Sequence, residues 1–376
     1  MNSAHRKLMS NMQLKSIFQT CLMIACYQNC IAAESIIEMR TAAGSHTGTP
    51  IYHNKQVCWL AEESGSYSSV LFRDVISSRR LEKTFHPYSS LQTKTELQRE
   101  LGRTFEVVAA GQFVVAAPRG KASTYARMLD VVSRSFSQYS SLRRLPVKDF
   151  SYPLVIIIYP NQLEFSIAAK KQEVLADRTL KGFYHPWTNR ILMFEEQVRS
   201  REVSANQGVN EATVSTLIHE GIHQLAFNQG LHSRVGRNPR WVVEGLANMM
   251  EVNIDVHRTH KHSESKINLS RLLRFKNYLS TTRKETIAEF IVDDEKYFRT
   301  DPLNAYSQAW SLTFFLAEEH PSAYAKYLKT IAERDPLLAE YSGKERLIDF
   351  QTAFGNDVSW LEVRFLRYID RLSTEE

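Results

Sequence analysis

Cysteine is scarce in this sequence. The chain has four cysteines among 376 residues, and three of them, Cys21, Cys26 and Cys30, lie within the first 33. Only Cys58 remains downstream, so residues 34–376 can form no disulfide within one chain. No pair of cysteines indicates a zinc site built from thiolates either. We therefore expect a fold stabilised by its hydrophobic core, for which a chain of this length suffices.

Long hydrophobic runs are also rare. The apolar run at residues 17–27 is too short and too interrupted for a stable membrane span. Three basic residues precede it, and Ala32 and Ala33 follow it before Glu34. This order is typical of a cleavable secretory signal over residues 1–33. We therefore expect an exported protein that acts in the periplasm, at the cell surface or as a secreted protein.

Alternatives remain open for this N-terminal segment. Cys26 ends an imperfect lipoprotein-type site, so a lipid anchor at Cys26 is the alternative to simple secretion. Translation from Met9 or Met12 would give a signal of more usual length. A disordered or buried N-terminus is the alternative to any signal.

The chain carries little excess of either charge. Its formal net charge is +6, and half of that excess comes from Arg6, Lys7 and Lys15, in a segment without Asp or Glu. The rest of the sequence contains no basic stripe and no recognised nucleic-acid motif, so we expect no nucleic acid as a partner. The apolar and charged fractions, 43% and 23%, are those of an ordinary globular protein.

A His-Glu-x-x-His motif gives the sequence its main chemical signal. A helix is predicted around it, because Asn210 is a good N-cap, Gly230 suits the helix end, and apolar residues recur at helical spacing between them. Residues four apart lie on the same face of a helix, so His219 and His223 could bind one metal ion. Glu220, next to the first histidine, could act on a water bound to that ion, as in zinc hydrolases.

A candidate for a third ligand, Glu244, lies in a second segment that is predicted to be helical. This segment, residues 241–251, begins just after Asn238 and Pro239. A catalytic zinc usually has three protein ligands and one open position for water. We therefore predict a Zn²⁺ site formed by His219, His223 and Glu244, with Glu220 as the general base.

The two motifs together resemble those of the gluzincins, a group within the metallopeptidase MA superfamily. The second helix of a gluzincin carries Trp-x-x-Glu-Gly-x-Ala, which residues 241–247 match. Around both motifs the chain is most similar to an uncharacterised family, domain of unknown function 1570 (DUF1570). The resemblance runs from about residue 105 to the C-terminus, and it is specific between residues 213 and 251.

The resemblance implies a zinc metallopeptidase with a peptide or protein substrate, and it suggests roles for two more residues. Glu251, seven residues after Glu244, is expected to orient a ligand histidine or to hold the amine of the substrate. Tyr306 is expected to direct its hydroxyl at the tetrahedral intermediate. The alternative for Tyr306 is that its side chain only packs against its neighbours, because the sequence around it does not match the motif of the gluzincins. The alternative for the whole protein is a non-catalytic zinc-containing binding module at the cell surface, although the presence of Glu220 argues against it.

The predicted fold class is α+β. We expect a zincin-like unit with a small mixed sheet and the active-site helices, then a C-terminal helical subdomain, with a small β-rich module before both. The expected units after the signal are residues 34–103 for the β-rich module, 104–260 for the zincin-like catalytic subdomain with both motif helices, and 261–376 for the helical subdomain.

The β-rich module contains no chemical motif. Its local signals predict strands near residues 56–60, 66–72 and 80–85, a turn between the first two, and a short helix within 88–102. Residues 44–50, which are polar and contain Gly, Ser and Thr, are expected to form a linker.

The catalytic subdomain is expected to alternate strands and helices. The signals predict a hairpin around Gly111, a helix over 123–142, a central strand at 154–159 and a hairpin over 183–194. In gluzincins a strand in the place of the last hairpin holds an extended peptide by backbone pairing. Glu195 and Glu196, which follow this hairpin, are expected to be solvated, and no exopeptidase activity is assigned from them.

Three further histidines, His257, His260 and His262, follow the second motif helix. A second metal site is one interpretation. A solvated loop is favoured, because no carboxylate and no apolar shell accompany these histidines.

Overall fold

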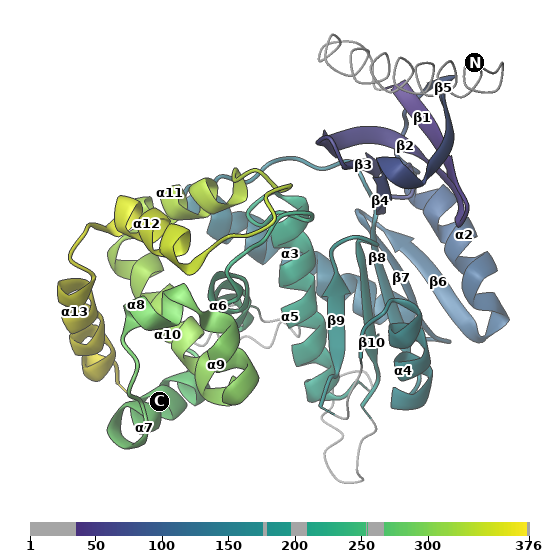
Figure 1. Ribbon diagram of the computed structural model, residues 1–376. Helices are drawn as coiled ribbons and strands as arrows, with labels where there is room; N and C mark the ends of the chain where they lie inside the picture. The colour runs from purple at the N-terminus through teal and green to yellow at the C-terminus, as the bar shows by residue number, and fades with distance from the viewer. Residues whose placement is uncertain (1–34, 176–178, 197–208, 253, 255–266, 374–376) are drawn as a thin grey trace, which may run out of the picture.

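The computed structural model of the chain describes residues 35–175, 179–196, 209–252, 254 and 267–373. Two β-sheets lie in the N-terminal half and a group of helices in the C-terminal half, so the α+β fold class is confirmed (Figure 1). The predicted signal, with its three cysteines, and the three histidines at 257, 260 and 262 lie outside the described residues. Within the described ranges, no helix combines the length and the apolar character that crossing a membrane requires.

Five antiparallel strands form the first sheet, in the order β4-β3-β2-β1-β5. They are β1 (Ser35–Thr41), β2 (Gly44–His53), β3 (Val57–Ala61), β4 (Tyr67–Leu71) and β5 (Val75–Thr84). The prediction of a linker at residues 44–50 is wrong, because β2 pairs with both β1 and β3. Its Gly, Ser and Thr residues do not alternate between apolar and polar side chains, so the sequence gives no signal for a strand. Backbone pairing with β1 and β3 holds β2 in place. A Cβ at Gly48 would lie 2.4 Å from the carbonyl oxygen of Ala61, so this close approach requires glycine.

The second sheet is mixed, in the order β6-β7-β8-β10-β9. Its strands are β6 (Phe105–Ala110), β7 (Phe113–Pro118), β8 (Leu154–Tyr159), β9 (Gly182–His185) and β10 (Arg190–Phe194). β7, β8 and β10 are parallel, and the two edge strands are antiparallel to their neighbours. The predicted central strand and both predicted hairpins are confirmed, and β9 lies at an edge.

Helices cover both faces of the second sheet. The helices on one face are α3 (Ala122–Leu142) and α5 (Glu211–Asn228), and those on the other are α2 (Ser90–Leu101) and α4 (Gln162–Lys171) (Figure 1). The strands contribute alternate apolar residues to two separate hydrophobic clusters, one on each face. The predicted caps of α5 are confirmed: the Asn210 side chain accepts from the Ala212 N–H, and Gly230 has φ +75°.

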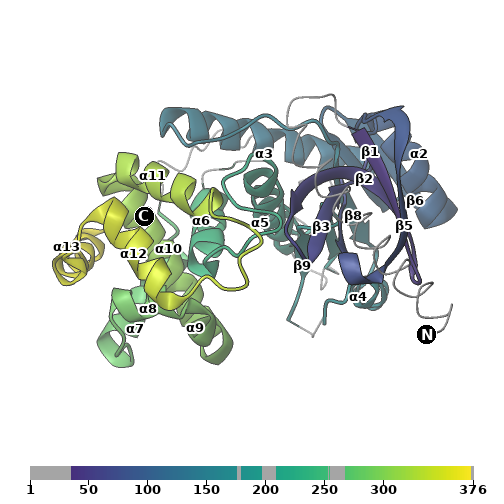
Figure 2. The ribbon, with the colours of Figure 1, turned by 45° about the horizontal axis from the view of Figure 1, so that its top comes forward.

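The first sheet contacts the second through the β9–β10 turn (Figure 2). The N–H of Tyr67 donates to the carbonyl of Trp187 at 2.6 Å. The buried guanidinium of Arg234 donates to the carbonyls of Gly65 and Pro186, each at 2.7 Å, and lies 3.7 Å from the centre of the Tyr67 ring. Arg234 therefore joins the first sheet to the loop that follows α5.

The C-terminal helices pack around α10. After α6 (Arg240–Glu251) the chain forms α7 (Leu269–Thr281), α8 (Ile287–Val292), α9 (Asp294–Thr300), α10 (Pro302–Glu319), α11 (Pro321–Ala332), α12 (Gly343–Phe354) and α13 (Val358–Arg371). α10 is buried along most of its length and contacts α6, α7, α9, α11 and α13. This packing connects the helical region to the second motif helix.

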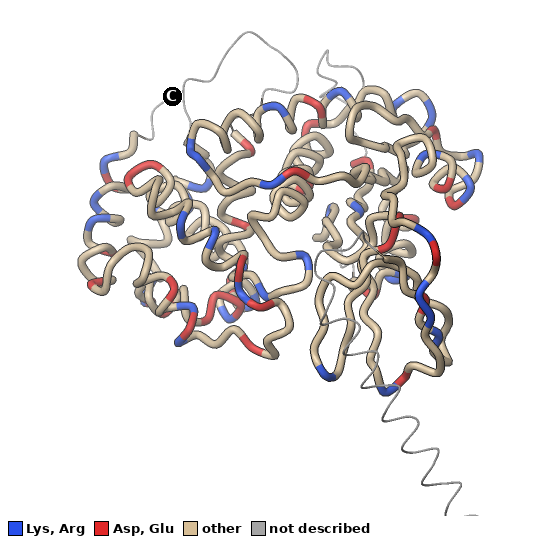
Figure 3. The backbone as a smooth tube through the Cα atoms, turned by 90° about the horizontal axis from the view of Figure 1, so that it is seen from above, with Lys and Arg blue, Asp and Glu red and all other residues tan. Residues whose placement is uncertain are grey.

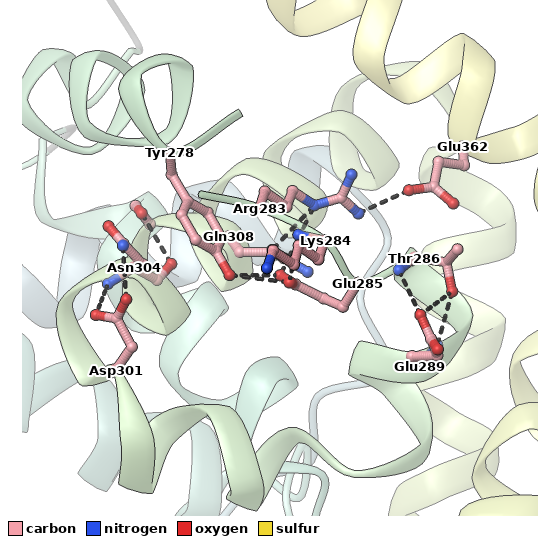
Figure 4. A network of polar contacts seen from close by, with 11 residues as sticks. Tyr278, Arg283, Lys284, Glu285, Thr286, Glu289, Asp301, Asn304, Gln308 and Glu362 are labelled. Carbon is pink, nitrogen blue, oxygen red and sulfur yellow. Dashed lines mark hydrogen bonds and ion pairs between the residues drawn. The ribbon is translucent and has the colours of Figure 1, made fainter. Parts of the chain in front are cut away.

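A polar network stabilises one part of this helical region (Figure 4). The buried Arg283, between α7 and α8, donates to Glu362 of α13 at 2.6 Å and to Gln308 of α10 at 3.4 Å. Glu285 lies 3.8 Å from Arg283 and accepts a hydrogen bond from Tyr278 at 2.8 Å. Each buried charge in this network therefore has a partner within the protein, as burial of an ion requires.

Gly245 sets the approach of α6 to α10, and this gives a stability prediction. A Cβ there would lie 2.1 Å from Oγ1 of Thr313 and 2.6 Å from the carbonyl oxygen of Ala309. Gly245→Ala should therefore lower the free energy of unfolding by about 3 kcal/mol or more, because backbone must move to relieve the overlap. Denaturant unfolding checks this.

Gly221→Ala is the matched control, because the nearest atom to its added methyl is a Leu129 side-chain carbon at 3.3 Å. It should unfold within about 1 kcal/mol of the wild type, since alanine also favours the helix by about that amount. Equal stability of the two variants would contradict the packing argument.

Candidate metal centre

α5 places His219 and His223 on one face, one turn apart. Their Nε2 atoms lie 3.0 Å from each other, and the two rings are nearly perpendicular. Both side chains point away from the apolar stripe by which α5 packs on α3 and the sheet. The predicted pairing of the two histidines is therefore present in the structure.

α6 brings Glu244 to the same point. Its Oε2 lies 3.4 Å from Nε2 of His219 and 3.6 Å from Nε2 of His223. The three ligand atoms lie within 4.8 Å of one another, and the described residues contain one such group of His, Cys, Asp or Glu side chains. The structure thus brings together all three predicted ligands, from two helices that pack against each other.

The donor set fits a divalent cation. Oε2 of Glu244 is buried and accepts no hydrogen bond, although buried carboxylate oxygens are normally paired. Burial alone would raise the pKa of Glu244, but the two adjacent imidazoles of His219 and His223 outweigh it and hold that pKa well below its usual range. Two imidazole nitrogens and one carboxylate oxygen, with a fourth position left for water, are the usual ligands of a catalytic zinc.

Glu251 lies where a partner of a ligand histidine is expected. Its Oε1 contacts Nδ1 of His219, on the side of the ring opposite Nε2. Burial lowers the pKa of His219, but the neighbouring carboxylates of Glu244 and Glu251 outweigh that effect and raise it well above its usual value. Such a partner fixes the tautomer and the orientation of a metal-binding imidazole.

Glu220 is buried and faces the edge strand β9. Its Oε2 accepts a hydrogen bond from the backbone N–H of Tyr184 at 2.7 Å. Burial raises the pKa of the Glu220 carboxyl above its usual value, against the opposing charges of His219 and His223. A carboxylate with a raised pKa next to a metal pocket is suited to accept and release protons.

Tyr306 lies in α10, which packs against α6, the helix that carries Glu244. Burial and the charge of Glu244 raise the pKa of its phenol to about 12, while Arg240 opposes the shift and Glu220 adds to it. The ring also packs edge-on against Phe298, with the ring centres 5.1 Å apart. The structure therefore places Tyr306 both near the ligands and within a packed aromatic cluster.

Sequence reasoning missed three residues around this centre. Arg240 lies 3.8 Å from Glu244, and its position four residues earlier on the same helix could have indicated this contact. Arg271 reaches Tyr306 from α7, which no local signal indicates. His232 is 1% exposed, neither of its ring nitrogens has a hydrogen-bond partner, and burial lowers its pKa to about 3.

A buried polar network ties α5, which carries the two histidines, to the turn after β9. Nε2 of Gln224, one residue after His223, donates to the carbonyls of Val155 and Asn189 at 3.2 and 2.9 Å. The Asn189 side chain exchanges hydrogen bonds with Asn228 and accepts one from the Tyr184 hydroxyl at 2.9 Å. The network therefore fixes the position of β9 relative to α5, and with it the contact between Tyr184 and Glu220.

The expectation that Glu195 is solvated is wrong. Its carboxylate accepts hydrogen bonds from the hydroxyl of Tyr125 and, at 2.6 Å, from Nζ of Lys121. Glu196 is more exposed and lies 3.2 Å from Lys181. α3 packs close to the end of β10, so Glu195 meets partners that are distant in sequence.

Comparison with known protein families gives one match. Residues 213–338 match the family described as "Protein of unknown function (DUF1570)". The matched segment includes the three ligand residues, Glu220, Glu251 and Tyr306. No curated protein matches the chain.

The geometry of the three ligands predicts one zinc per chain. Purified protein should hold about one equivalent of zinc, because the described residues provide a single three-ligand site. His223→Ala should lose it, since two ligands seldom retain zinc. Metal analysis after dialysis checks this.

His53→Ala, at an exposed position in β2, is the control and should keep its zinc. Stoichiometric zinc in His223→Ala would contradict the ligand assignment.

The network around Asn189 gives a second test. Asn189 has φ +59°, a conformation that glycine adopts without strain, so Asn189→Gly removes the amide and keeps the turn. The loss of buried hydrogen bonds should lower the free energy of unfolding by about 1–3 kcal/mol.

Arg144→Gly is the matched control, because Arg144 is exposed and has φ +53°. It should not be destabilised. A neutral Asn189→Gly would show that the network does not hold the turn.

Proposed function

We propose that this protein is a zinc-dependent metallopeptidase of the gluzincin type. The observation that carries the proposal is the group formed by His219, His223 and Glu244, whose ligand atoms lie within 4.8 Å of one another, beside a fourth buried side chain, Glu220, that is not a ligand. Structural zinc sites are usually closed by four protein ligands. A three-ligand pocket with an adjacent carboxylate supports hydrolysis better than a purely structural role.

The chain's own residues provide the proton transfers. When bound, a zinc ion supplies the Lewis acidity that lowers the pKa of a water molecule from about 15.7 to about 7. Glu220 would accept the proton of that water and deliver it to the leaving amine. The N–H of Tyr184 holds Oε2 of Glu220, so one carboxylate oxygen is fixed and the other is left for the water. Tyr306 would donate a hydrogen bond to the oxyanion as it forms.

The position of β9 supports a peptide as the substrate. β9 pairs with β10 on one side only, and the N–H of Tyr184 points away from β10 toward Glu220. The Tyr184 N–H is taken by Glu220, so an extended peptide would pair with other backbone groups of this edge, which would hold its backbone next to the candidate metal site.

Export is part of the same proposal. The basic, apolar and small-residue order of residues 1–33 supports a cleavable signal, with a lipid anchor at Cys26 as the alternative. The peptide or protein substrate would then be met outside the cytoplasm.

Glu220→Gln separates an enzyme from a zinc-containing binding module. The variant keeps nearly the same volume and an oxygen that can accept from Tyr184, but it cannot take up a proton. Zinc content and thermal unfolding should stay unchanged, while peptide hydrolysis should fall by about 10²–10⁴-fold. Cleavage of a peptide library, measured on the same preparation as the zinc content, checks this.

Glu211→Gln makes the same chemical change at an exposed position of the same helix and should leave hydrolysis intact. Equal cleavage rates of Glu220→Gln and the wild type, at equal zinc content, would reject Glu220 as the base and favour the binding module.

A further inference from the structure

Arg240 begins α6 and reaches the outer side of Glu244. Its Nε lies 3.8 Å from Oε1 of Glu244, whereas Oε2 of that carboxylate faces the two histidines. Its Nη1 lies 3.4 Å from the exposed Glu295, and its guanidinium lies 4.5 Å from the centre of the Phe298 ring. The side chain of Arg240 remains 36% exposed. It can therefore still receive a ligand at the edge of the metal pocket.

Arg271 approaches the same place from α7. Its guanidinium carbon lies 5.3 Å from the centre of the Tyr306 ring. Among the described residues, no carboxylate forms an ion pair with this half-buried arginine. Arg271 also lies in the first turn of α7, where the helix dipole favours negative charge and not a cation. Apart from its contact with the Tyr306 ring, Arg271 therefore has no partner for its charge among the described residues.

Tyr306 lies between the two arginines. Its ring faces Arg271, and it packs edge-on against Phe298, the ring over which the Arg240 guanidinium lies. Arg240 also contacts Glu244, so this group of side chains lies beside the candidate metal site. Over the rest of the described chain, basic and acidic residues are interspersed (Figure 3). Two arginines also flank Tyr341, but there both pair with carboxylates, whereas Arg271 forms no ion pair among the described residues.

We propose that Arg240 and Arg271 form a subsite for a carboxylate of the substrate. This inference rests on the proposed peptidase function and names the class of peptide that the site would take. Guanidinium groups bind carboxylates with two parallel hydrogen bonds, and Arg271 has its donors available for that purpose. Arg240 is partly neutralised by Glu244 and Glu295, so Arg271 is the main determinant of the preference.

The position of the subsite limits where the carboxylate lies in the peptide. Arg240 contacts Glu244, a candidate metal ligand, and Arg271 lies against the ring of Tyr306. A carboxylate close to the scissile bond would therefore reach the subsite. Either the C-terminal carboxylate of a short peptide or the side chain of Asp or Glu meets this condition.

Four internally quenched peptide libraries distinguish these two sources. They combine a fixed Glu or Gln with a C-terminal carboxylate or amide, and they are cleaved by the zinc-loaded protein. For one of the two carboxylates we expect kcat/KM to be about 10- to 100-fold higher than for its neutral counterpart. Arg271→Gln should abolish this difference. Arg274→Gln, which is exposed one turn further along α7, should keep it.

Binding to the metal-free protein gives a measure that does not depend on activity. Glutarate, titrated by calorimetry, should bind the wild type and Arg274→Gln with similar affinity, and Arg271→Gln at least about 10-fold more weakly. Zinc content and thermal unfolding report whether each variant is folded. If Arg271→Gln does not fold, Arg271→Lys replaces it and should show a smaller preference, because lysine cannot bind a carboxylate through two parallel hydrogen bonds.

The failure of this inference can be told apart from the failure of the proposed function. Cleavage of all four libraries at the same rate by the wild type would overturn the subsite and leave the peptidase proposal intact. Cleavage of none of them by fully zinc-loaded protein would overturn the peptidase proposal. Glutarate that binds Arg271→Gln as well as the wild type would overturn the subsite in either case.

Discussion

Three polar atoms have to face one another inside the protein, and much of the structure serves this requirement. The ligand atoms of His219, His223 and Glu244 lie within 4.8 Å, where buried polar groups without partners cost free energy. Helical spacing in α5 sets the distance between the two histidines. The third ligand depends on α6, which Gly245 allows to lie directly against α10. The site is therefore held by backbone packing among three helices.

The sheet contributes the orientation of the proposed base. Glu220 is held by a backbone N–H of β9, and side-chain amides of α5 and of the β9–β10 turn fix that strand relative to the helix. These amides are buried, so each hydrogen bond that is lost leaves an unpaired polar group in a dry environment. The positions of the three candidate ligands thus depend on the packing of helices, whereas the orientation of Glu220 depends on the sheet.

Local signals explain which elements could be predicted. The motif helices follow from caps such as Asn210 and from helical periodicity, both of which lie within one stretch of sequence. β2 was missed because pairing with two neighbouring strands holds it, and its short polar side chains carry no pattern. Arg271 could not be assigned to the site, because its place beside Tyr306 depends on the packing of α7 against α10. Glu195 was misjudged for the same reason, since its partners Lys121 and Tyr125 lie at the start of α3.

The candidate metal site differs from the buried ion pairs elsewhere in the fold in how its charges are paired. Glu220, Glu244 and Glu251 surround two histidines, and neighbouring carboxylates disfavour one another's ionised form. The N–H of Tyr184, Arg240 and His219 each offset one of them. Even so, Oε2 of Glu244 has no hydrogen-bond donor among the described residues. In the network around Arg283, by contrast, each buried charge meets a partner within the protein. A closed network of that kind holds helices together, whereas an acceptor left open between two imidazoles fits a bound cation.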